Sequence, residues 1–171
     1  MVVEQAVRLS PYDRMLQAGE YEFDRGTPAL QTVYRIRRGQ VTMRSVTVIE
    51  GWRLEEVADA VTEQGVSRDE FISAARAGDY DFEFLADLDQ DESLEGYLFP
   101  AVYPIGSLQE PSDIVEGMLA AFDQNVPAEV AEKADEAGLT LHEVVTIASI
   151  IEREAQVPDE RPVMAQVFLS R

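Results

Sequence analysis

The segment from residue 141 to 156 constrains the fold more than any other part of this chain. Drawn as a helix, it is apolar over well over half of its circumference, and Thr140 and Glu143 form a capping box at its start. A helix that is apolar on so many sides needs neighbours around most of its surface. The segment therefore predicts a packed helical region in which this helix is enclosed.

Two carboxylates, Glu152 and Glu154, interrupt the apolar part of this helix and fall on its opposite flanks. Burying a charge is costly unless the charge is paired or used, so two hypotheses follow. In the first, one or both carboxylates pair with Arg153, Arg161 or another basic residue and reach solvent near the helix end. In the second, one of them lines a sheltered cleft, where desolvation favours the protonated form and makes it a general acid. Helical periodicity does not say which one.

The rest of the chain predicts a mixture of strands and helices. Alternating apolar and polar residues indicate strands at 18–23, 41–49 and 79–84. Helical spacing, capping residues and terminal glycines indicate helices at 28–38, 52–64, 67–78, 112–124, 128–137, 141–156 and from about 159. The segment 94–106 is expected to be extended between proline residues. We therefore expect an α+β fold with a mixed N-terminal part and a helical C-terminal part.

Composition argues against several classes of site. The formal charge of −19 would repel a phosphate backbone, so nucleic acid is not expected as a partner. The absence of cysteine removes thiolate metal sites, and the single histidine, His142, argues against histidine metal sites and Ser-His-Asp triads. The spacing of Asp87, Asp89 and Asp91 resembles a calcium loop but lacks its glycine and its bidentate glutamate. We expect no metal and no cofactor.

Four sequence blocks occur in an order that resembles the MltG-like (YceG-like) endolytic murein transglycosylase family. They are LQAGEYEF (16–23), VTVIEGWRLEEVADAV (46–61), LEGYLFPAVY (94–103) and IASIIEREAQVPDERPVMAQVFLSR (147–171). The resemblance spans nearly the whole chain. It implies an N-terminal strand-helix-strand region at 1–45, and a LysM-like strand-helix-helix-strand unit with the extended EGYLFP segment at 46–104. It also implies the helical start of a catalytic domain, truncated at its C-terminus, at 105–171.

The resemblance also implies an activity. Members of this family cut the β-1,4 bond between N-acetylmuramic acid and N-acetylglucosamine in peptidoglycan and leave a 1,6-anhydromuramoyl end. One glutamate acts as general acid and then as base toward the C6 hydroxyl of the sugar. The family's I-x-E-x-E block assigns this role to Glu154 and makes Glu152 a supporting carboxylate. Glu95 matches a further motif position and is a supporting candidate, either as a substrate ligand or as a hydrogen-bonding anchor.

Three aromatic residues of the extended segment, Tyr97, Phe99 and Tyr103, are candidates for stacking on a sugar ring. Aromatic residues at alternate positions are also typical of a core. The family's FPDTY is FPAVY here, so Ala101 and Val102 lack the hydrogen bonds of that polar pair. The stacking role and the core role both stay open.

The resemblance implies peptidoglycan glycan strands as substrate and the cell-wall synthesis machinery as a further candidate partner. It places the protein at the extracytoplasmic face of the bacterial cell membrane, through an anchor that this chain lacks. The family's sequence continues beyond Arg171 with segments that form the cleft, so we expect part of the cleft wall to be missing. An inactive fragment would therefore be compatible with an active parent enzyme. The alternative to an enzyme is a non-catalytic peptidoglycan-binding or scaffold module whose glutamates are structural.

Overall fold

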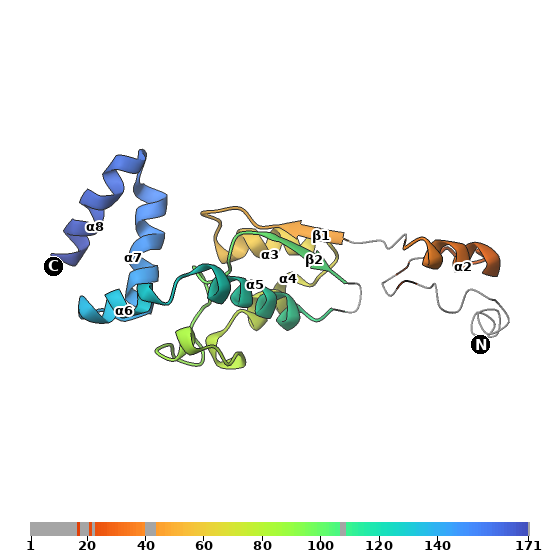
Figure 1. Cartoon of the computed structure of the whole chain (residues 1–171), viewed down its shortest axis with the longest axis horizontal. Helices are drawn as coiled ribbons and strands as arrows, with labels where there is room; N and C mark the ends of the chain where they lie inside the picture. Colours follow the sequence, from red (N-terminus) through yellow and green to blue (C-terminus); the bar gives the residue numbers. More distant parts are fainter. Residues whose placement is uncertain (1–16, 18–20, 22, 40–43, 107–108, 171) are drawn as a thin grey trace. The chain divides into compact units, whose positions relative to one another are not determined.

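The computed structural model describes residues 17, 21, 23–39, 44–106 and 109–170. The chain divides into two compact units (Figure 1). The first comprises Met1–Arg44 with Pro104–Leu108, and the second comprises Ser45–Tyr103 with Gln109–Arg171.

The described part of the first unit is built around helix α2 (Ala29–Arg37), which the sequence predicted. The helix is followed by Gly39, whose φ of 61° suits glycine at a helix C-terminus. The hydroxyl of Tyr21 donates a hydrogen bond to the carbonyl oxygen of Ile36 at 3.1 Å, which ties the preceding segment to the last turn of α2. The strand predicted at 18–23 lies mostly outside the described residues.

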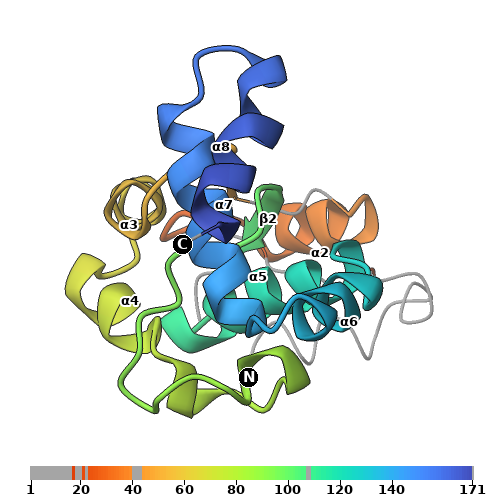
Figure 2. The ribbon, with the colours of Figure 1, turned by 90° about the vertical axis from the view of Figure 1, so that its left-hand side faces the viewer.

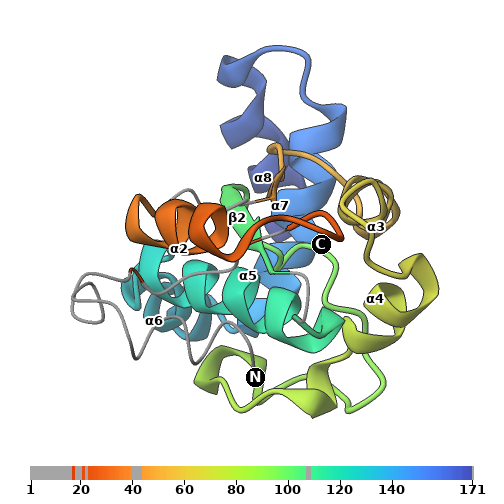
Figure 3. The ribbon, with the colours of Figure 1, turned by 90° about the vertical axis from the view of Figure 1, so that its right-hand side faces the viewer.

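A small sheet and three helices surround the main core. Strands β1 (Arg44–Thr47) and β2 (Val102–Ile105) form a two-stranded sheet. Helix α4 (Arg68–Ala74) packs against α3 (Leu54–Thr62) and against α5 (Pro111–Asn125), as Figure 3 shows. The fully buried side chains from these helices and the loop before β2 include Val57, Val61, Phe71, Leu94, Tyr97, Ile114, Val115, Met118 and Leu119.

The chain returns to β1 later than the sequence predicted. The strand expected at 79–84 is wrong, because this stretch contains the short 3-10 helices η2 (Ala77–Asp79) and η3 (Glu83–Leu85) instead. Backbone hydrogen bonds near η2 go to the loop at 90–92, and the aromatic side chains that gave the alternation pack inwards from a turn. Two aspartates in the stretch also disfavour a strand. Strand β2 pairs with β1, so a LysM-like unit is not confirmed.

Four elements follow α5, close to the predicted positions: α6 (Glu129–Glu136), α7 (Leu141–Glu154), the 3-10 turn η4 (Pro158–Glu160) and α8 (Arg161–Leu169). Helix α7 packs against α6 and α8, and α7 and α8 form the helical hairpin seen in Figure 2. The structure is therefore α+β, mostly helical with a small sheet. Within the described residues, no helix combines the length and apolarity that crossing a membrane requires.

Helix α7 is less enclosed than the sequence predicted. Ile151 is its buried residue, whereas Ile150 is 40% exposed. The prediction of a helix enclosed on most sides is therefore wrong for the described part of the chain. Periodicity identifies apolar positions but not how many neighbours will cover them, and here α6, α8 and two turns cover only part of the surface.

The capping box at the start of α7 is present and is testable. Thr140 Oγ1 accepts a hydrogen bond from the Glu143 backbone N–H at 3.1 Å, and Glu143 Oε2 accepts one from the Thr140 N–H at 2.8 Å. We expect Thr140→Ala to lower the free energy of unfolding by about 1 kcal/mol, measured by urea denaturation. Thr140→Ser keeps an acceptor oxygen and should retain most of that stability. Equal losses in the two variants would contradict this role.

Candidate functional site

Helix α7 rests on the turn formed by residues 95–97, which belong to the EGYLFP motif. Gly96 has a φ of 90°, and a Cβ atom at this position would lie 2.9 Å from Val145 Cγ1 and 3.2 Å from Ser149 Oγ. Tyr97 continues the contact, because its hydroxyl lies 3.2 Å from His142 Nδ1 and the two rings are nearly parallel. The EGYLFP turn therefore forms the surface against which α7 packs.

Two clefts lie beside this contact. The first, here called the glutamate cleft, has a volume of about 520 Å³. The residues that line only this cleft are Glu92, Ser93, His142, Thr146, Ile150 and Glu154. The second, of about 390 Å³, is called the tryptophan cleft; its own lining includes Trp52, Gly96, Val144, Ala148 and Glu152. The lining shared by both clefts consists of Arg53, Glu95, Val145, Ser149 and Arg153.

The spacing of residues along α7 explains this division. Residues four apart lie on one ridge of a helix, and the shared residues Val145, Ser149 and Arg153 form such a ridge over the turn. The next ridge to one side ends at Glu154, and the ridge to the other side ends at Glu152. The two glutamates therefore lie on opposite flanks, as predicted, and each lines a different cleft.

The structure brings Glu154 and Glu95 together in the glutamate cleft. Glu154 is the last residue of α7, Glu95 comes from the opposing turn, and both are exposed. The sheltered position predicted for a catalytic carboxylate is therefore not found, because the packed strip of α7 does not extend around its end. Glu154 nevertheless faces a concave surface.

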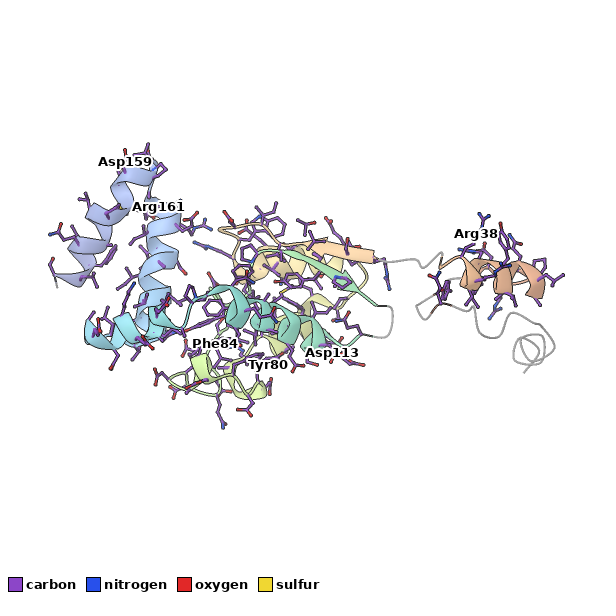
Figure 4. The ribbon with its side chains drawn as sticks, in the orientation of Figure 1. Arg38, Tyr80, Phe84, Asp113, Asp159 and Arg161 are labelled. Carbon is purple, nitrogen blue, oxygen red and sulfur yellow. The ribbon has the colours of Figure 1, made fainter. Side chains whose placement is uncertain are left out.

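Glu152 has a structural partner. Its Oε2 lies 3.0 Å from Nη2 of Arg161 at the start of α8, and both side chains are about half exposed. Figure 4 labels Arg161 in the α7–α8 hairpin. Arg161 is among the partners predicted from the sequence. The ion pair links the end of α7 to α8 and engages Glu152, while Glu154 makes no ion pair within the described residues.

The aromatic candidates take other positions. Tyr97 is fully buried, with its ring centroid 5.9 Å from that of Phe84 and 5.2 Å from that of Phe122. In this structure Tyr97 is a core residue with no surface to offer a sugar. Phe99 and Tyr103 are half-buried and do not line either of the two clefts; Tyr103 donates a hydrogen bond to the carbonyl oxygen of Phe99 at 2.6 Å.

Sequence analysis missed Trp52 and Arg53 as site residues. They follow Gly51, where a Cβ atom would lie 3.9 Å from Glu152 Cγ, so this turn approaches the end of α7. Trp52 is half-buried in the wall of the tryptophan cleft. A half-exposed indole offers a ligand an apolar face together with a polar N–H edge. The available signal was that Trp52 is the only tryptophan of the chain.

The sequence profile of the YceG-like family matches residues 1–171. The chain belongs to the YceG-like family. This membership confirms the resemblance identified from the four sequence blocks.

Two relatives and one solved structure are similar to this chain over most of its length. An endolytic murein transglycosylase of Streptococcus pneumoniae is 27% identical to this chain, and the match covers 91% of this chain and 32% of the relative. An endolytic murein transglycosylase of Bacillus subtilis is 29% identical, and the match covers 91% of this chain and 47% of the relative. The chain thus spans less than half of these curated relatives. The crystal structure of a YceG-like protein of Listeria monocytogenes is also similar, and the match covers 94% of this chain and 57% of the Listeria chain. The TM-score of 0.56 at 24% sequence identity shows a shared fold.

The buried tyrosine gives this YceG-like protein a testable pH dependence. Burial raises the pKa of Tyr97 to about 12, and the nearby charges of Asp87 and Glu92 add to the effect. An unfolded tyrosine loses its proton near pH 10, so between about pH 10 and 12 the unfolded state binds fewer protons than the folded state. We therefore expect the urea midpoint to fall as pH rises through this range. Burial also raises the pKa values of Tyr80 and Tyr103, so Tyr97→Phe should weaken the fall without removing it. An unchanged pH dependence in Tyr97→Phe would contradict this assignment.

Proposed function

We propose that this chain belongs to an endolytic lytic transglycosylase of peptidoglycan and carries its catalytic carboxylate, Glu154. The observation that carries the proposal is the position of Glu154 in the wall of a cleft that Glu95 of a second motif also lines. Two relatives that match 91% of the chain are named endolytic murein transglycosylases, which supports the same activity. The enzyme cleaves the β-1,4 bond between N-acetylmuramic acid and N-acetylglucosamine and leaves 1,6-anhydromuramoyl ends.

The reaction requires one group that gives and then takes a proton. The Glu154 carboxylic acid protonates the glycosidic oxygen, and the bond between this oxygen and C1 of the muramyl residue breaks. The resulting carboxylate then accepts the proton of the C6 hydroxyl, whose oxygen forms the new bond to C1. Glu154 ends protonated again, and no water is consumed. A second carboxylate acting as nucleophile or base, as in ordinary glycosidases, is therefore unnecessary.

The remaining site residues support this step. Glu95, which lines the same cleft, accepts hydrogen bonds from sugar hydroxyl or amide groups. Glu152, held by Arg161, fixes the end of α7. Trp52 stacks on a sugar ring in the tryptophan cleft. A strand seated along α7 displaces water from the exposed Glu154 carboxyl, which supplies the shelter that the free protein lacks. The protein acts where its substrate lies, at the extracytoplasmic face of the bacterial cell membrane.

One observation favours a second candidate function. Because Glu154 is exposed in the free chain, the protein could bind peptidoglycan without cutting it. Incubation with purified glycan strands, followed by mass spectrometry, separates the two functions. A transglycosylase releases internal fragments with anhydro ends that are one water lighter than hydrolysis products. The incubation is done with this chain and with a longer parent protein, and strands that bind both proteins and remain intact with both would support the binding module and overturn the proposed activity.

A further inference from the structure

Arg53 and Arg153 reach the same clefts from two different elements. Arg53 immediately precedes α3, and Arg153 lies in the last turn of α7. Both are exposed, and both line the glutamate cleft and the tryptophan cleft. The close approach of Gly51 to Glu152 Cγ holds these two parts of the chain near each other. Both arginines therefore line the proposed path of a glycan strand.

These two arginines differ from the other described arginines of the second unit. Arg68 lies 2.6 Å from a carboxylate oxygen of Asp59, Arg76 donates to the Asp91 carbonyl oxygen at 2.8 Å, and Arg161 pairs with Glu152. Among the described residues, the guanidinium groups of Arg53 and Arg153 make no ion pair and no hydrogen bond. The chain carries 33 acidic and only 14 basic residues, so carboxylates are abundant as partners. Two arginines that line the same clefts and have no such partner among the described residues therefore indicate an anion that comes from outside the chain.

The chemistry of that anion follows from the side chains and from the proposed substrate. A guanidinium group binds carboxylates through parallel N–H donors, which gives orientation as well as attraction. The acetylated sugars of the glycan backbone are neutral, and the carboxylates of peptidoglycan belong to the peptide stem and to the lactyl group of muramyl residues that lack a stem. Both sources lie on the muramyl residue.

We propose that Arg53 and Arg153 form a carboxylate-binding site that recognises the muramyl residue through its peptide stem or its free lactyl group. This inference rests on the proposed function, because it takes peptidoglycan as the substrate. The site distinguishes muramyl residues from N-acetylglucosamine residues and places the strand in one register on α7. This register places C1 of the muramyl residue, and not C1 of the neighbouring N-acetylglucosamine residue, next to the Glu154 carboxyl.

The position of Trp52 provides a local readout for binding. Because Trp52 is the only tryptophan and follows Gly51 in the wall beside Arg53, its fluorescence can be titrated with ligand, with calorimetry in parallel. The ligands are a short muramyl-peptide oligomer, the same oligomer with its carboxyl groups amidated, a stem-free oligomer with free lactyl groups, and a neutral N-acetylglucosamine oligomer. Comparison of the stem-bearing with the stem-free oligomer identifies which carboxylate is bound.

For the wild type, we expect the carboxylate-bearing oligomers to bind about tenfold more tightly than the amidated and neutral ones, with a difference that shrinks as salt increases. The double variant Arg53→Gln, Arg153→Gln should lose this preference and keep the affinity for neutral oligomers. Lys133→Gln removes one positive charge on α6, away from both clefts, and should keep the preference. Both arginines are exposed and unpaired, so an unchanged melting temperature is expected and confirms folding.

Two outcomes would overturn the assignment in different ways. If neutral oligomers bind and carboxylates add nothing, or if the double variant keeps the preference, the arginine site is wrong and the proposed function stands. If none of the oligomers binds and glycan strands stay intact, the proposed function falls and the arginine site falls with it.

Discussion

Replacing Glu154 with glutamine is expected to reduce the release of anhydromuramoyl ends by a factor of about 10² to 10⁴. This range is the usual contribution of a general acid and base, and the amide keeps the size of the side chain while losing its ability to give a proton to the glycosidic oxygen. Binding of glycan strands, followed by Trp52 fluorescence, should change little. The substitution is at an exposed position at the end of α7, so the melting temperature should be preserved.

Glu152→Gln is the matched control for this experiment. It makes the same chemical change two residues away, on the opposite flank of α7 and in the other cleft. The variant weakens the exposed ion pair with Arg161, which contributes no more than about 1 kcal/mol, so activity should fall less than tenfold. If Glu152→Gln abolished cleavage while Glu154→Gln left it intact, the two glutamates would have to exchange roles.

Gly96→Ala is expected to lower the free energy of unfolding by about 2 to 4 kcal/mol. Two effects add up: a side chain is strained at a φ of 90°, and the new Cβ atom would lie 2.9 Å from the stiff Val145 side chain. Relief requires α7 to move away from the turn, so cleavage should also fall. Urea denaturation and the glycan assay measure the two effects.

Gly117→Ala provides the control for the loss of a glycine. Gly117 lies within α5, and a Cβ atom at this position would meet no atom within 4 Å. Alanine is the better helix former, so this variant should gain about 0.5 to 1 kcal/mol. A Gly96→Ala protein as stable as the wild type would show that α7 does not depend on its contact with the turn.

Local signals predicted the helices well. The helix beginning at Thr140 could be located from the sequence because its capping box depends on residues three apart, and the same holds for α4, where Ser67 accepts a hydrogen bond from the Glu70 N–H. The strand predicted at 79–84 was wrong because alternation of apolar and polar residues does not show whether a partner strand is available for pairing. Those residues turn inwards, and Phe84 packs on Phe122 of α5, a contact that sequence spacing does not reveal.

The candidate site was predictable only in part. The sequence placed Glu152 and Glu154 on opposite flanks of one helix, which helical geometry alone determines. The exposure of Glu154, and the presence of Trp52 and Arg53 in the clefts, depend on how α7 docks on turns far away in the sequence. No local pattern contains that information.

The ridge of α7 that rests on Gly96 is a wall common to both clefts. Rolling the helix about this line of contact would move Glu154 and Glu152 in opposite senses, so space gained on one side would be lost on the other. A ligand that occupied only one side would thus reshape the vacant side. A polymer long enough to fill both clefts would instead hold the helix at a single angle, and an extended strand is a polymer of this kind.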